Sequence, residues 1–108
     1  MKLHDLAHAR AGDKGAICDL SVVAYRPADY PFLCEHLTTE RVARHFADIV
    51  RGRVDRYELP RLHALKFVLH DALDGGVTRT LNLDAHGKTL SSSLLEMDLP
   101  EHPEDDQR

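Results

Sequence analysis

The residues best suited to chemistry gather in one short stretch near the start of the chain, Ala9–Gly15, which reads ARAGDKG. Glycine adopts positive φ at little cost and leaves its N–H group uncovered, so a loop with two glycines can close around an anion. Arg10 would add a planar fork of donors and Lys14 a mobile point charge. Asp13 could instead bond the N–H groups of the loop, which would make it an ordinary exposed turn. Both interpretations stay open, and the stretch matches neither the Walker nor the dinucleotide motif.

A second stretch, GGVTR, ends at Arg79. Arg79 has the phase of the apolar residues in the strand expected there, and a guanidinium on an apolar face is costly unless it is paired or holds a ligand. It could instead extend from the end of the strand to water. Asp13 and Asp19 are possible internal partners, and Asp19 lies on the mixed face of a strand, where acids are usually solvated.

We expect these two stretches to meet at one end of a sheet, with Arg10 and Lys14 near Arg79. Three cations gathered there would repel one another by about 1 kcal/mol for each close pair even at water-like dielectric. Something negative should therefore share the site, either the acids Asp13 and Asp19 or a bound phosphate or carboxylate.

Motifs for metal binding or nucleophilic catalysis are missing from the sequence. His4 and His8 would lie about 13 Å apart along one strand, which is too far for a single metal ion. His63 and His70 are seven residues apart, and no Cys/His cluster occurs. We expect no metal and no cofactor, and the sequence identifies no catalytic residue.

The bulk composition indicates one small domain, since 108 residues can form one core but not two. The net charge of -4 argues against a nucleic-acid surface, and no apolar run could span a membrane. With no signal peptide evident, a cytoplasmic location is expected. Cys18 and Cys34 lack metal-ligand spacing and are expected to stay reduced.

Hydrophobic periodicity predicts an α+β two-layer sandwich with a mainly antiparallel sheet and two main helices on one face. Residues 1–99 would form the domain, and residues 100–108 an acidic, disordered tail. A strand over Leu65–Leu69 is the alternative to the second main helix. The expected elements are strands over Lys2–Ala9, Ala16–Tyr25, Val54–Leu59, 77–83 and Thr89–Leu99, helices over Ala28–Leu37, 39–51 and Leu62–Leu73, and a hairpin turn over Asp84–Lys88.

The face of the sheet left open by the helices should be more apolar than a wet surface needs. Its residues would include Val23, Tyr25 and either Leu95 or Met97. A homo-oligomer is therefore expected.

Five segments together resemble the small domain of acyclic terpene utilization (AtuA-like) proteins. That domain is described as ferredoxin-like and occurs at the C-terminus of longer chains or alone. The resemblance covers about residues 3–99. The segments are ARAGDKG (9–15), RYELP (56–60), LHALKFVLHDAL (62–73), GGVTRTLNLD (75–84) and HGKTLSSSLLEMDL (86–99).

The resemblance extends the list of candidate ligand-binding residues. Asp19, where Asn is common in the family, alters the charge beside the glycine stretch, so the resemblance does not imply an identical ligand. Arg61, Lys66, Asp74 and Ser91 are further departures. The candidates are Arg10, Gly12, Asp13, Lys14, Gly15, Asp19, Gly76, Thr78 and Arg79.

The family's larger domain is linked to the catabolism of branched acyclic terpenoid acids as acyl-CoA. The resemblance thus implies a pathway context and no mechanism. The first hypothesis, which the missing acid–base and nucleophile motifs favour, is an auxiliary or binding subunit that docks on a larger AtuA-type partner or self-assembles and holds an anion such as CoA or a carboxylate. The alternative is a small lyase, hydratase or isomerase, with Asp13 or Asp19 as acid–base and Arg10 or Arg79 holding the anion. A purely structural oligomerisation domain is the third hypothesis.

Overall fold

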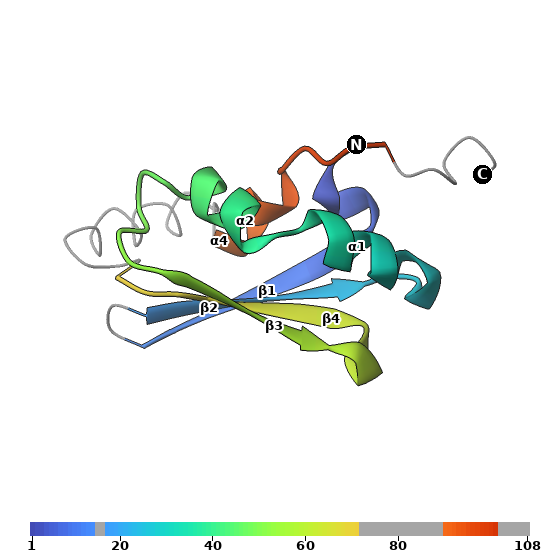
Figure 1. Cartoon of the computed structure of the whole chain (residues 1–108), viewed down its shortest axis with the longest axis horizontal. Helices are drawn as coiled ribbons and strands as arrows, with labels where there is room; N and C mark the ends of the chain where they lie inside the picture. Colours follow the sequence, from blue (N-terminus) through green and yellow to red (C-terminus); the bar gives the residue numbers. More distant parts are fainter. Residues whose placement is uncertain (15–16, 72–89, 102–108) are drawn as a thin grey trace.

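A computed structural model describes residues 1–14, 17–71 and 90–101, and Figure 1 shows two layers, a sheet below and helices above. The sheet has the strand order β1-β2-β4-β3, and each neighbouring pair is antiparallel. This arrangement confirms the α+β, ferredoxin-like sandwich. The strands are β1 (Ala7–Lys14), β2 (Ile17–Ala24), β3 (Val54–Leu59) and β4 (Ala64–Leu69).

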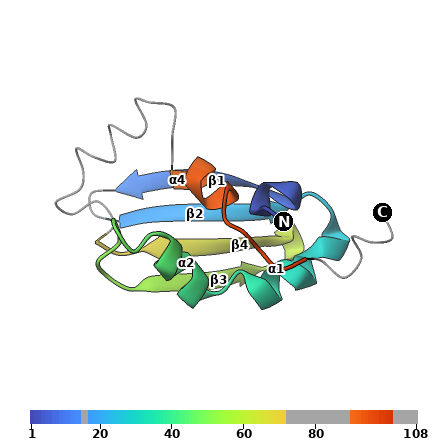
Figure 2. The same cartoon turned by 90° about the horizontal axis from the view of Figure 1, so that it is seen from above.

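Among the described residues, three short α-helices cover one face of this sheet: α1 (Tyr30–His36), α2 (Thr39–His45) and α4 (Leu90–Leu95). Helix α4 lies over β1 and α2 lies over β3 (Figure 2). Single 3₁₀ turns at Leu3–Asp5, Pro27–Asp29 and Pro60–Leu62 connect the elements. None of the helices in the described segments is long and apolar enough to cross a bilayer.

The helix predicted over Leu62–Leu73 is wrong, because Ala64–Leu69 within this segment forms strand β4, which confirms the alternative strand over Leu65–Leu69. Its residues Leu65, Phe67 and Leu69 alternate with half-buried ones and are fully buried. Strands β2 and β3 bond to its two sides, so β4 is an inner strand of the sheet. Leucines spaced for a helix also satisfied the two-residue period, and pairing along both edges favoured the strand.

The strand predicted over Thr89–Leu99 is also wrong. Leu90 and Leu94 are four residues apart and both buried, which places them on one side of α4. Met97 is buried in the core and Leu95 packs against it. The expectation that Leu95 or Met97 lies on the open face of the sheet is therefore wrong.

The start of the chain also differs from the strand predicted over Lys2–Ala9. A 3₁₀ turn comes first, and β1 begins at Ala7 and continues through most of the glycine stretch to Lys14. Gly12 is therefore a strand residue opposite Asp19, and not part of a loop.

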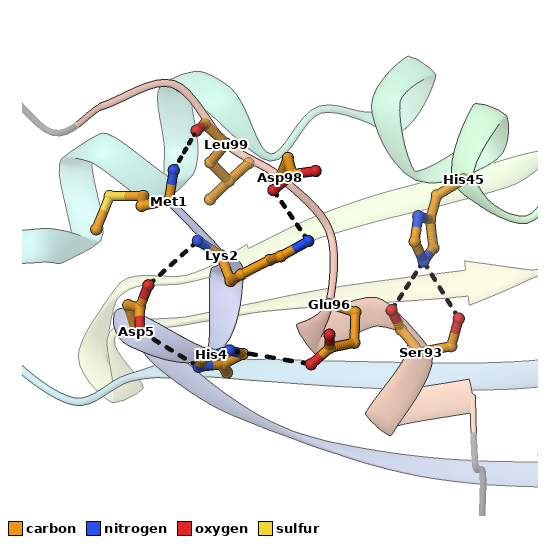
Figure 3. A network of polar contacts seen from close by, with 9 residues as sticks. All are labelled: Met1, Lys2, His4, Asp5, His45, Ser93, Glu96, Asp98 and Leu99. Carbon is orange, nitrogen blue, oxygen red and sulfur yellow. Dashed lines mark hydrogen bonds and ion pairs between the residues drawn. The ribbon is translucent and has the colours of Figure 1, made fainter.

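Polar contacts between the two ends of the described chain hold α4 in place (Figure 3). Lys2 pairs with Asp98 at 3.1 Å, and the backbones of these two residues form a β-bridge. Nε2 of His45 lies 2.9 Å from the carbonyl oxygen of Ser93, which ties α2 to α4. The three helices are thus fixed on one side, and the opposite face of the sheet stays uncovered by them.

Helix α1 ends over an inward-facing arginine. The guanidinium of Arg56 donates to the carbonyl oxygens of Cys34 at 2.8 Å and Leu37 at 3.2 Å. These carbonyls belong to the last turn of α1, where no partner exists within the helix. Arg56 therefore joins β3 to the helical layer.

Tyr30 gives a first prediction, because its hydroxyl is buried with no hydrogen-bond partner among the described residues. Burial raises the pKa of Tyr30 from 10.0 to about 12. Between these values the unfolded chain loses the phenolic proton more readily than the folded chain, so stability falls as the pH rises. Tyr30→Phe should be neutral at pH 7, or stabilising by up to about 1 kcal/mol, and should flatten the alkaline loss.

Urea denaturation at pH 7, 10 and 11 measures this effect. The exposed Tyr25 serves as a control, since Tyr25→Phe should follow wild type at each pH. A clear loss of stability in Tyr30→Phe at pH 7 would mean that the hydroxyl has a partner in solution.

Candidate functional site

The uncovered face of the sheet carries one continuous polar row across all four strands. In β2, Leu20 and Val22 are buried under the helices, so Ser21 between them faces the other side. Cross-strand pairing then places Arg10 beside Ser21 on one side and Lys66 on the other. Tyr57 pairs with Lys66 and completes the row at the edge of the sheet.

The two cations of this row have no polar partner among the described residues. Neither Arg10 nor Lys66 makes an ion pair or a side-chain hydrogen bond with any residue in the parts of the chain that the structure describes. By contrast, Lys2, Arg53 and Arg56 are each paired with a carboxylate. Two unpaired cations flanking a hydroxyl form an arrangement that can bind a phosphate or a carboxylate.

The next row towards the β1–β2 turn begins with Gly12 and Asp19. The two residues are in close contact, because a Cβ atom added at Gly12 would lie 3.3 Å from Oδ1 of Asp19 and that side chain would have to shift slightly. Val68 follows on β4 and Asp55 on β3. This row therefore places two carboxylates on the same face as Arg10 and Lys66.

An imidazole–carboxylate pair lies at this end of the face. Nε2 of His70, which directly follows β4, is 2.8 Å from Oδ2 of Asp55. Nε of Arg53 donates to both oxygens of the same carboxylate at 3.2 Å. Hydrogen bonds from His70 and Arg53 hold the pKa of Asp55 below its ordinary value, so the carboxylate stays ionised.

The opposite end of the face is apolar. Val23 is half-buried, and Tyr25 is 59% exposed with its ring 5.6 Å from that of His8. A shallow hollow of about 470 Å³ adjoins the β3–β4 turn. Its lining residues are Glu58, Leu59, Pro60, Arg61 and Leu62.

Exposed apolar side chains favour this face as well. Ile17, Tyr25 and Tyr57 have the phase of the uncovered face, and Leu62 lies in the turn that bounds it. These four residues are the large exposed hydrophobic side chains among the described segments. Tyr25 and Leu62 lie at the apolar end of the face, Tyr57 lies in the row of Arg10 and Lys66, and Ile17 lies at the charged end beside the β1–β2 turn.

Three of the residues singled out in the sequence come together here. Arg10, Gly12 and Asp19 lie on the uncovered face, on adjacent positions of β1 and β2. The backbones of Asp13 and Lys14 pair with β2, but their side chains lie outside the description. Gly15, Gly76, Thr78 and Arg79 fall outside the described residues, as do the predicted strand over 77–83 and the turn after it.

Sequence reasoning missed Lys66, Tyr57, Asp55 and His70 as members of this face. On the helix predicted over residues 62–73, Lys66 and His70 would share a side, but a helix would not pair Lys66 with Ser21 or bring His70 beside Asp55. The alternation of Lys66, Val68 and His70 with three buried residues was the signal that could have joined them. No group of three or more His, Cys, Asp or Glu side chains suited to a metal ion occurs within 1–14, 17–71 and 90–101.

Comparison with known proteins gives one match. Residues 1–100 match the family model described as the AtuA ferredoxin-like domain. No curated protein and no solved structure matches the chain.

Proposed function

Because the chain belongs to the family of the AtuA ferredoxin-like domain, we propose that it is an auxiliary binding subunit for a larger AtuA-type protein. In this role it takes part in the catabolism of branched acyclic terpenoid acids as CoA thioesters. The uncovered face of the sheet holds an anionic group of the ligand, either a phosphate of CoA or a carboxylate.

The observation that carries this proposal is the row of Arg10, Ser21 and Lys66. The two cations are unpaired among the described residues and stand on either side of a hydroxyl, two strands apart. Neighbouring strands lie about 4.8 Å apart, so the backbones of Arg10 and Lys66 are separated by about 10 Å. Their long side chains can reach one anion from both sides.

Titration of the protein with CoA, followed by calorimetry, tests the proposal. Wild type should bind saturably, and Arg10→Gln or Lys66→Gln should each weaken binding about tenfold, the loss of one charged hydrogen bond. Arg44→Gln is the matched control, because this exposed arginine belongs to α2 in the other layer and its replacement changes the net charge equally.

If Arg44→Gln and Arg10→Gln weakened CoA binding equally, the loss of affinity would come from the change in net charge and not from a specific site. An absence of saturable binding to wild type, with CoA and with simple carboxylates, would rule out the anion site.

Assembly is a second part of the proposal. The apolar end of the uncovered face, with Tyr25 and Leu62 exposed at 59% and 64%, is more apolar than a wet surface requires. We expect the purified protein to form a homo-oligomer at micromolar concentration, and Tyr25→Ser combined with Leu62→Ser to weaken it. Light scattering measures the mass. A monomer mass that persists as the concentration rises would contradict this expectation.

The alternative of a small lyase, hydratase or isomerase with Asp13 or Asp19 as its acid–base residue has less support. Asp19 lies on the uncovered face, yet no base or nucleophile among the described residues contacts its side chain. A purely structural role would leave the unpaired cations of the charged end without a purpose. The CoA titration distinguishes that role from ligand binding.

A further inference from the structure

The charged end of the uncovered face contains one group that can accept a proton and is already oriented. His70 follows the last residue of β4, and its backbone N–H donates to the carbonyl oxygen of Arg53 at 2.9 Å. Its ring is held through Nε2 by Asp55 at 2.8 Å. The side chain is 23% exposed, so the ring is both oriented by Asp55 and partly accessible.

The two ring nitrogens of His70 have different roles in this geometry. Because the carboxylate of Asp55 is an acceptor only, Nε2 carries the hydrogen and donates it. The neutral ring then has its lone pair on Nδ1, which has no partner in the described parts of the chain. A carboxylate that fixes the tautomer and stabilises the imidazolium is the arrangement that general-base histidines use.

We propose that His70, positioned by Asp55, is a general base that removes a proton from the carbon next to the thioester carbonyl of an acyl-CoA bound on the uncovered face. This inference rests on the proposed function, from which it takes a CoA thioester as the ligand. It assigns to the face a proton-transfer activity that binding alone does not require.

The step balances within the bound ligand and the protein. Nδ1 of His70 takes the proton, and the electron pair of the broken C–H bond moves into the new C=C bond as the carbonyl oxygen becomes an enolate. The proton returns to the same carbon or exchanges with water. The guanidinium of Arg53 donates to both oxygens of Asp55 and so helps to fix the carboxylate that positions His70.

The spacing of the face favours a thioester over a short free acid. Lys66 and His70 are four strand residues apart, or about 13 Å. A carboxylate and its own adjacent carbon are directly bonded and cannot span this distance. In a CoA thioester the phosphates and the reactive carbon are joined by a long flexible arm, so the phosphate can lie at Arg10 and Lys66 with the acyl group near His70.

Charged groups from three parts of the chain lie at the same end of the face as His70. Arg53 directly precedes β3 and Asp55 lies within it, Asp19 belongs to β2, and Asp71 directly follows His70 in the chain. Asp55 is the group in contact, and its removal would take away the charge that favours the imidazolium.

The experiment measures exchange of the α-protons of isovaleryl-CoA in D₂O by proton NMR, together with its binding by calorimetry. Wild type should exchange these protons faster than buffer alone. His70→Gln should lower the protein-dependent rate about 100-fold while leaving the dissociation constant within twofold. Free isovalerate should exchange no faster than in buffer.

The variant Asp55→Asn tests whether Asp55 positions His70 for proton transfer or only stabilises the fold. We expect the midpoint of its pH–rate profile to move to lower pH, because the imidazolium loses its ionised partner. His8→Gln, on the same face but at the apolar end, should keep both the wild-type rate and the profile.

The two proposals fail in different ways. Saturable binding of isovaleryl-CoA to wild type without faster exchange would overturn the assignment of His70 and leave the anion site standing. Exchange that depends on His70 without saturable binding would overturn the anion site alone. Wild-type rates in His70→Gln would also overturn the base, and the absence of both binding and exchange would overturn both.

Discussion

Replacing Gly52 by alanine is expected to lower the free energy of unfolding by about 3 kcal/mol, the upper end of the usual cost of overpacking. An added Cβ would lie 2.6 Å from the carbonyl oxygen and 2.9 Å from the carbonyl carbon of His70. The N–H of Gly52 donates to the same carbonyl at 3.0 Å, so the two backbones must stay in contact. Neither backbone can move aside without breaking that bond at the end of β4.

Chemical denaturation of wild type and Gly52→Ala measures this cost, and Gly12→Ala is the control. At Gly12 the nearest atom to an added Cβ is the flexible Oδ1 of Asp19, at 3.3 Å. The expected change there is below about 1 kcal/mol, since alanine also costs less strand entropy than glycine. If the two variants were equally stable, the close approach of Gly52 to His70 would be contradicted.

Phe67→Ala is expected to cost about 3 to 5 kcal/mol, as is usual for a large aromatic side chain removed from a core. Phe67 has no exposed surface and lies in the middle of β4, opposite Leu20 of β2 and Arg56 of β3. No neighbouring residue can fill the space, because its cross-strand partners are already bonded into the sheet. The midpoint of urea unfolding measures the loss.

Tyr57→Ala is the control for Phe67, since it removes an aromatic ring from the neighbouring strand on the uncovered face. Tyr57 is 49% exposed, and its loss should cost no more than about 1 kcal/mol. Similar costs for the two rings would mean that β4 is not buried on the helical side as described.

Local patterning was enough to predict the class of the fold. The alternation of Cys18, Leu20 and Val22 predicted β2 to within a residue at each end, and Val54–Leu59 forms a strand with the expected bounds. The start of α2 at Thr39 also agrees with the helix expected from residue 39, and Oγ1 of Thr38 caps it by accepting from the N–H of Arg41 at 3.1 Å. These signals depend only on neighbours in the sequence.

The errors come from segments whose state depends on distant partners. Residues 62–73 satisfied both a helical and a strand period, and only the edges of β2 and β3 decide between them. Gly52 suited the end of a long helix, but α2 ends at His45 and Gly52 serves the contact with His70. In both cases the deciding interaction lies outside the window of sequence that the pattern covers.

Only the part of the candidate site that is close together in the sequence could be predicted. Arg10, Gly12 and Asp19 stood out because they lie close together in the sequence and were expected beside a turn. Lys66 and His70 join them only through the register of β2 with β4, which no local spacing reveals. A correct strand in place of the second predicted helix would have brought them onto the same face.

The central claim, that the uncovered face of the sheet is the ligand-binding surface, is tested most directly by NMR mapping of the amide and side-chain shifts during titration with CoA. The account predicts saturable shifts at Arg10, Ser21 and Lys66, with the amides of α1 and α2 unchanged. Saturable shifts confined to the helical layer, with Arg10, Ser21 and Lys66 unmoved at saturating CoA, would contradict it.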